Sequence, residues 1–118
     1  MLIIDEYNNI TLTRGDTAYI DLSEFFDYDG DTYYLQQGDK IYFRLRTPKQ
    51  ILTKELEINT GLNMATLTIN PEDTIPFAFG DYRYEMELVT VDNEHFTFIA
   101  DKRFTVDKEQ EVHRNGSW

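Results

Sequence analysis

Apolar and polar side chains alternate along several short segments of the chain. The clearest example is the segment 40–46, where Ile41, Phe43 and Leu45 would face one side of a strand. Alternation of this kind is typical of a half-buried β-strand, because successive side chains point to opposite faces of the sheet. The same pattern recurs in the segments 9–13, 18–22, 52–58, 64–69, 82–88 and 95–106. We therefore expect an all-β fold in which each strand contributes one face to a shared core.

Turn residues separate these segments. The glycines before the C-terminal segment all lie between expected strands: Gly15, Gly30, Gly38, Gly61 and Gly80. Glycine is favoured in turns because it adopts positive φ angles without steric cost. Short strands separated by regular turns are typical of an immunoglobulin-like β-sandwich. We expect such a sandwich of about seven to eight antiparallel strands in residues 1–108, followed by a polar C-terminal tail, 109–118.

Two shorter elements are expected between the strands. The Asp-Gly step at Asp29 is a strong hairpin signal, and it predicts a short strand over Thr32–Leu35. The segment Asn70–Thr74 is expected to begin a single helical turn, because Pro71 is suited to the first helical position and the acidic residues after it suit the positive end of a helix.

Tyr82 lies near the start of the penultimate strand, directly after Gly80 and Asp81. Immunoglobulin-like domains often place a tyrosine here and bond its hydroxyl to the backbone upstream, an arrangement called the tyrosine corner. The alternative is an ordinary inward-facing strand residue. We favour the corner, because the segment from Pro71 to Phe79 is similar to the loop that usually precedes one.

Charge and composition exclude several classes of partner and chemistry. The chain has 118 residues, with 22 acidic and 11 basic side chains and a formal net charge of −11. Nucleic acid and anionic membranes are poor partners for such a surface, because phosphate contacts require Lys and Arg. There is no cysteine, so disulfides, thiol nucleophiles and cysteine-based zinc sites are absent. The residues 1–6 lack the basic start and long apolar core of a secretory signal, so we expect either a soluble cytoplasmic product or a chain whose signal has been removed.

Three acidic residues around one turn offer a candidate cation site. Asp27, Asp29 and Asp31 carry hard oxygen ligands of the kind that Ca²⁺ prefers. The EF-hand pattern is not met, because Gly30 precedes the third acid and no bidentate Glu follows at the required spacing. We favour a solvated turn, and weak calcium binding stays open.

The remaining polar motifs do not indicate catalysis. Arg14-Gly15-Asp16 matches an integrin-binding tripeptide, but Gly15 is also suited to a turn between two strands, and we favour the turn. His95 and His113 lie in separate segments without ligand spacing. Glu85 and Glu87 are expected to face solvent from one strand. We therefore predict no catalytic residue, cofactor or resident metal.

Aromatic residues in loops are better candidates for a functional surface. Tyr28, Tyr33 and Tyr34 cluster around one turn, and aromatic loops often contact proteins or sugars. Phe77 and Phe79 flank a second loop, and we expect them to close one end of the core. The tyrosine cluster is the interaction surface that the sequence favours.

Three segments, Asn9–Thr17, Leu35–Phe43 and Gly80–Glu85, carry a resemblance to a known group of proteins. Together they resemble small proteins from tail and structural modules of phages and prophages of Gram-positive bacteria. They are also similar to the N-terminal immunoglobulin-like domain of phage baseplate upper proteins, in which a rigid sandwich attaches a receptor-binding assembly to the tail. The similarity runs from residue 8 to residue 106. Baseplate upper proteins continue into further modules, so the resemblance implies a free-standing accessory or virion component.

The sequence thus favours a non-enzymatic structural or protein-interaction module associated with a phage tail or baseplate. Its expected partners are other virion proteins or copies of itself, and its expected location is the virion, assembled in the bacterial host cytoplasm. The alternative is a bacterial carbohydrate- or cell-surface-binding β-sandwich, for which the surface formed by Tyr28, Tyr33 and Tyr34 would be the contact.

Overall fold

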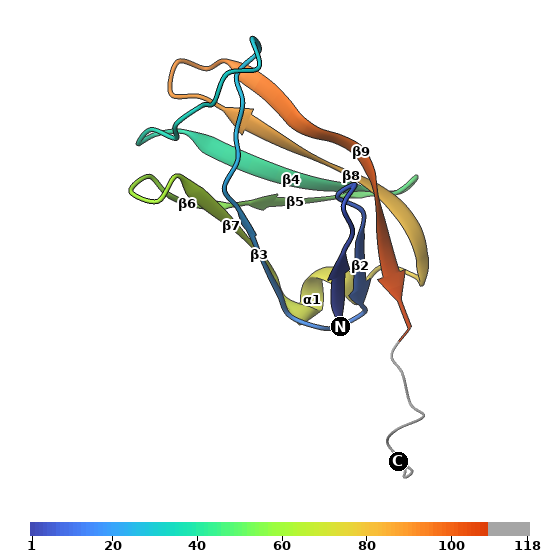
Figure 1. The fold of residues 1–118 in the computed structure, drawn as a ribbon. Helices are drawn as coiled ribbons and strands as arrows, with labels where there is room; N and C mark the ends of the chain where they lie inside the picture. The colour runs from blue at the N-terminus through green and yellow to red at the C-terminus, as the bar shows by residue number, and fades with distance from the viewer. Residues whose placement is uncertain (109–118) are drawn as a thin grey trace.

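The structure, a computed structural model, describes residues 1–108, and the predicted tail 109–118 lies outside the described residues. Its strands are β1 (Leu2–Ile4), β2 (Ile10–Thr13), β3 (Ala18–Leu22), β4 (Lys40–Arg46), β5 (Ile51–Glu55), β6 (Glu57–Asn59), β7 (Met64–Ile69), β8 (Gly80–Val89) and β9 (His95–Asp107), and the helical turn α1 is Pro71–Thr74. A six-stranded sheet has the order β1-β2-β9-β8-β4-β5, and a three-stranded sheet has the order β3-β7-β6 (Figure 1). The prediction of an all-β fold is confirmed.

The core lies between the inner faces of the two sheets. Three aromatic rings from the central strands β4, β8 and β9 meet there: the centroid of Phe43 lies 5.4 Å from that of Tyr84 and 5.9 Å from that of Phe104. The buried hydroxyl of Tyr84 donates a hydrogen bond of 2.5 Å to the carbonyl of Asn8. Burial, together with the charge of Asp5, raises the pKa of Tyr84 to about 12. The alternation predicted for Ile41, Phe43 and Leu45 is confirmed, since all three are fully buried.

The prediction that every strand is antiparallel to its neighbours is wrong for one pair. β2 runs parallel to β9, with Ile10 opposite Phe104 and Thr13 opposite Asp107. Alternation shows which face of a strand is buried but not the direction of its neighbour, and only a short hairpin forces antiparallel pairing. β1 was not expected, because Leu2–Ile4 is a continuous apolar run; it pairs antiparallel with β2 at the edge of the large sheet.

The segment 52–58, expected as one strand, is divided between the two sheets. β5 pairs with β4 in the large sheet, and β6 pairs with β7 in the small sheet. Leu56 lies at the break, where it is 3% exposed and donates its N–H to the carbonyl of Ile41 at 2.8 Å. Leu52, Leu56 and Ile58 keep the same two-residue period across the break, so the pattern gives no sign of it.

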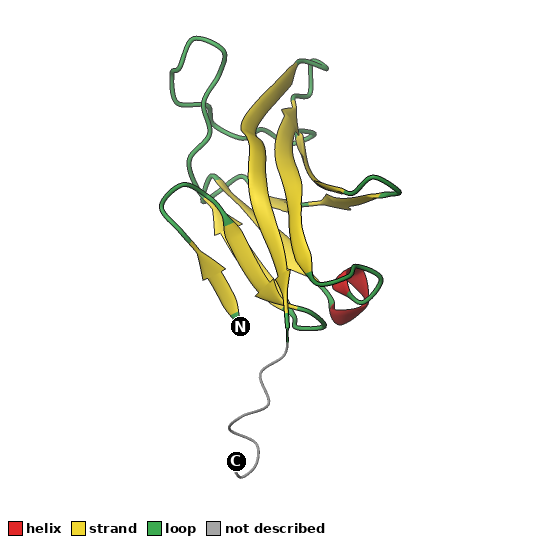
Figure 2. Ribbon diagram, turned by 90° about the vertical axis from the view of Figure 1, so that its right-hand side faces the viewer, coloured by secondary structure: helices red, strands yellow, loops and turns green. Residues whose placement is uncertain are grey.

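The strand predicted over Thr32–Leu35 is also wrong, because this segment is a loop with a single bridge between Phe26 and Thr32 (Figure 2). The N–H of Leu35 donates to the side-chain oxygen of Asn63 at 2.7 Å. The N–H of Gln36 donates to a carboxylate oxygen of Asp39 at 2.8 Å. Side-chain acceptors therefore take the place of a neighbouring strand.

The helical turn predicted from Asn70 is confirmed as α1. The carboxylate of Asp73 accepts the backbone N–H of Asn70 at 2.8 Å, which fixes the start of the turn. Lys54 of β5 also donates to Asp73, at 2.7 Å, and ties α1 to the edge of the large sheet.

Candidate functional site

The three tyrosines predicted to form an interaction surface have different environments. Tyr28 is 78% exposed and stacks on Phe96 of β9, with ring centroids 6.1 Å apart and an interplanar angle of 22°. Tyr34 is 70% exposed. Tyr33 is half-buried against the core, and its hydroxyl donates to Asp39 at 2.8 Å. Tyr28 and Tyr34 are thus accessible to a partner, whereas Tyr33 holds its loop in place.

Asp39 is a buried carboxylate that joins three parts of the chain. One oxygen accepts the hydroxyl of Tyr33 and the N–H of Gln36, both at 2.8 Å, and the other accepts the N–H of Val91 at 2.8 Å. Burial of the phenol, followed by its hydrogen bond to Asp39, raises the pKa of Tyr33. Asp39 was not predicted as a functional residue, because an Asp directly before a strand has no pattern that distinguishes it from a solvated turn.

The candidate cation ligands lie together in space. The carboxylate oxygens of Asp27, Asp29 and Asp31 lie within 4.8 Å of one another. One oxygen of Asp27 accepts the backbone N–H groups of Asp29 at 2.9 Å and Asp31 at 3.1 Å, so this side chain shapes the turn itself. Asp29 and Asp31 are exposed, and weak calcium binding at the turn stays a prediction.

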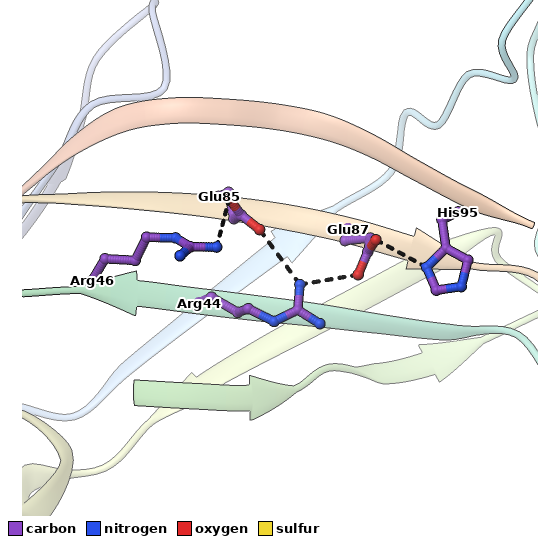
Figure 3. A network of polar contacts seen from close by, with 5 residues as sticks. All are labelled: Arg44, Arg46, Glu85, Glu87 and His95. Carbon is purple, nitrogen blue, oxygen red and sulfur yellow. Dashed lines mark hydrogen bonds and ion pairs between the residues drawn. The ribbon is translucent and has the colours of Figure 1, made fainter. Parts of the chain in front are cut away.

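A network of charged side chains covers part of the outer face of β4 and β8 (Figure 3). Arg44 contacts Glu87 at 3.0 Å and Glu85 at 3.5 Å, and Arg46 contacts Glu85 at 3.2 Å. The Nδ1 atom of His95 lies 3.0 Å from Glu87. Burial acts to raise the pKa of Glu87, but the hydrogen bonds from His95 and Arg44 and the Arg44 charge outweigh it and leave the pKa lowered.

The carboxylate of Glu87 joins the arginine and histidine parts of this network. Both oxygens of Glu87 are engaged, one by Arg44 and one by His95. Figure 3 shows all five side chains lying along the strands rather than converging on one point. The sequence placed Glu85 and Glu87 on one face, and the pairing of β8 with β4 adds the arginines that neutralise them.

The Arg14-Gly15-Asp16 tripeptide is held by contacts within the molecule. The guanidinium of Arg14 donates to the carbonyl of Ile75, at 3.1 Å from Nε and 2.5 Å from Nη2. Gly15 has a φ of 84°, and its N–H donates to the buried hydroxyl of Thr74 at 2.8 Å. Asp16 pairs with the amino group of Met1. These contacts give Gly15 a structural role at the turn between β2 and β3.

Tyr82 and Gly80 lie where the chain enters β8. The hydroxyl of Tyr82 donates to the carbonyl of Ala78, four residues upstream, at 2.7 Å. Its ring packs edge-on against Phe77, with centroids 5.4 Å apart, and Phe77 is 4% exposed. Gly80 has a φ of 146°, a conformation that other residues rarely adopt. Of the two phenylalanines expected to close this end of the core, Phe77 does so and Phe79 is exposed.

Within residues 1–108, no helix is long and apolar enough to cross a membrane. His113, the second histidine considered as a ligand, lies outside them. In comparisons with known proteins, no family model matches the chain, and no curated protein matches it significantly.

Proposed function

We propose that the chain is an immunoglobulin-like sandwich that serves as a non-enzymatic structural or protein-interaction module of a phage or prophage tail. The observation that supports the fold is the strand order. Immunoglobulin-like domains place strands B, E and D in one sheet and C, F and G in the other, and variable-type domains add strand C′ beside C. The orders β3-β7-β6 and β9-β8-β4-β5 correspond to B-E-D and G-F-C-C′. Tyr82, near the start of β8, then occupies the tyrosine-corner position of strand F.

The phage setting rests on the resemblance of Asn9–Thr17, Leu35–Phe43 and Gly80–Glu85 to phage tail and baseplate proteins. These segments include β2 with its following turn, the buried Asp39 before β4, and the start of β8. They therefore contribute to the turns that set the shape of the domain. A rigid domain of this kind acts by presenting surfaces rather than by turning over a substrate.

The free edges of the sheets are natural sites for protein partners. β1 and β5 are the outer strands of the large sheet, and β3 and β6 are those of the small sheet. An edge strand carries unpaired N–H and C=O groups that can extend the sheet into another chain. Partners are thus other virion components or a second copy, and the location is the virion after assembly in the host cytoplasm.

The test is co-purification of the tagged full chain with the tail-gene products of its own phage or prophage. Retention of at least one of these proteins is expected. A glycan array tests the carbohydrate-binding alternative, which the exposure of Tyr28 and Tyr34 favours. Glycan binding that Tyr34→Ala abolishes, with no virion protein retained, would replace the proposal. Tyr19→Ala is the matched control, because Tyr19 is also well exposed, at 68%, but lies on β3 of the small sheet, away from the loop that carries Tyr34.

A further inference from the structure

Three arginines lie in a row across the outer face of the large sheet. Arg46 of β4 is directly opposite Arg83 of β8, and Arg83 is directly opposite Arg103 of β9. Directly opposed residues on neighbouring strands point to the same face, and like charges in such positions destabilise a sheet. All three side chains are exposed. The arginine row thus gathers three of the chain's 11 basic side chains on one face of the sheet.

Neighbouring carboxylates neutralise the arginine row incompletely. Glu85 is shared between Arg46 and Arg44, and Asp101 lies 3.7 Å from the Nε atom of Arg83. Within residues 1–108, no carboxylate lies within ion-pair distance of Arg103. Asp5 is near enough for hydrogen bonds from Asn9 and Tyr7, together with the Arg103 charge, to lower its pKa. A guanidinium carries five N–H donors, so the row keeps donors for an incoming carboxylate.

A hollow of about 330 Å³ lies beside the arginine row and leaves room for such a group. It is lined by Asn9, Asp81, Tyr82, Arg83 and Arg103. The carboxylate of Asp81 is itself held by the hydroxyl of Thr105 at 2.6 Å. Two arginines and one acid thus border a space large enough for a carboxylate.

The loop Asp27–Asp31 carries negative charge, opposite in sign to the arginine row. Its three carboxylates have oxygens within 4.8 Å of one another, and Asp29 and Asp31 are exposed. Each cluster brings like charges together in the isolated chain. Contact between the loop and the row would reduce the repulsion within each cluster.

The loop and the row lie at different positions along β8 and β9. Tyr28 of the loop stacks on Phe96, which is opposite Leu88, whereas the row crosses β8 at Arg83. The rise along a strand places Leu88 and Arg83 about 17 Å apart. The loop therefore cannot reach the row of its own chain, and a contact between them must join two copies.

We propose that the Asp27–Asp31 loop of one copy docks on the arginine row of the next. The contact joins two different surfaces, so it is head-to-tail, and repetition gives a ring or an open filament. This inference rests on the proposed function and names a second copy as the partner.

The test is sedimentation velocity of the full chain over a concentration series at about 0.1 M salt, where charges more than about 10 Å apart are largely screened. The wild type is expected to form assemblies larger than a dimer. Arg83→Glu and Asp29→Lys are each expected to weaken association at least about tenfold, as is usual when a close interfacial charge pair is reversed. Arg103→Glu is a second variant of the row, and circular dichroism checks that each variant is folded.

A mixture of two neutral variants gives the sharper result, because the two charge reversals would attract each other. Arg83→Ala keeps an intact acidic loop, and Asp29→Ala keeps an intact arginine row, so an equal mixture should form a dimer and nothing larger. Lys40→Glu and Glu57→Lys are the matched controls, since both are exposed strand residues outside the two clusters and change the net charge equally. Both controls should assemble like the wild type.

Two outcomes overturn the inference. Assembly of Arg83→Glu and Asp29→Lys equal to that of the wild type shows that copies meet elsewhere, and it leaves the proposed interaction function standing. A wild type that is monomeric throughout also refutes the head-to-tail contact. The proposed function fails as well only if co-purification then retains no virion protein.

Discussion

The two ends of the sandwich are closed by different kinds of contact. At the end near α1, Phe77 is buried against Tyr82, and the backbone carbonyls of Ile75 and Ala78 accept hydrogen bonds from side chains. At the opposite end, the carboxylate of Asp39 holds Tyr33 and the β8–β9 turn together. The first end depends on apolar packing, which is tolerant of pH. The second depends on a buried acceptor, so it is sensitive both to the loss of that acceptor and to ionisation of its donor.

The largest loss of unfolding free energy is expected at the end of the sandwich that is closed by Asp39. Asp39→Ala leaves the hydroxyl of Tyr33 and the N–H groups of Gln36 and Val91 without their acceptor. A hydrogen bond to a charged acceptor contributes about 1.5–3 kcal/mol, and water replaces part of the sum at the exposed Gln36 and Val91, so we expect a loss of about 3–5 kcal/mol in urea unfolding. The exposed Asp29, changed to Ala, should lose less than about 0.5 kcal/mol. Similar losses of stability in the two variants would show that Asp39 does not hold this end of the fold together.

The next largest loss of unfolding free energy is expected at the end that is closed by Phe77. Phe77→Ala removes a buried ring from against Tyr82 and is expected to cost about 3 kcal/mol. Phe79 is the control, because it is 51% exposed and its ring is covered only on one side, by Arg14. Phe79→Ala should cost less than about 1 kcal/mol. A larger loss for Phe79 than for Phe77 would mean that the two rings exchange places in solution.

The hydrogen bond of Tyr82 should have a smaller effect. Tyr82→Phe keeps the packing against Phe77 but removes the donor to Ala78, and one such bond contributes about 0.5–1.5 kcal/mol. Tyr19→Phe is the control, since Tyr19 projects from β3 into solvent. An unchanged denaturation midpoint for Tyr82→Phe would show that the hydroxyl exchanges this carbonyl for water without loss.

The smallest effect is expected at alkaline pH, where ionisation of Tyr33 should lower the stability of the end closed by Asp39. Burial raises the pKa of Tyr33 in the folded state, so the unfolded chain loses this proton first as the pH rises through about 10. The folded state then binds more protons than the unfolded state, and stability falls with rising pH. The fall between pH 8 and pH 11 should be shallower in Tyr33→Phe than in the wild type. Tyr84, whose pKa is also raised, titrates in both chains and cancels in the difference. Parallel pH profiles would contradict the prediction.

The patterns within short segments of the sequence predicted much of this fold. They predicted little of the end that is closed by Asp39. The alternation in 40–46 and 82–88 identified the buried faces of β4 and β8, because period and burial are linked directly. The signals around Gly15 and Pro71 are also local, and the structure has a turn and α1 there. Asp39 is different: its donors include Val91, which is 52 residues away, and no pattern near Asp39 indicates that contact.

Partners distant in sequence explain the other errors. The parallel pairing of β2 with β9 and the change of sheet at Leu56 depend on which strands become neighbours after the chain has folded. The arginine row has the same origin, since Arg46, Arg83 and Arg103 belong to three segments and only strand register brings them together. A single sequence contains these residues but not their register.

The parallel pairing of β2 with β9 has a mechanical consequence. Tension applied at Ile10 and at Asp107 pulls the two strands past one another, so the hydrogen bonds between residues 10–13 and 104–107 are loaded together in shear. β1 is antiparallel to β2, and tension on Leu2 opens that pair from its free end, one bond after another. A pulled chain should therefore release β1 at low force and then resist until β2 and β9 separate in a single step.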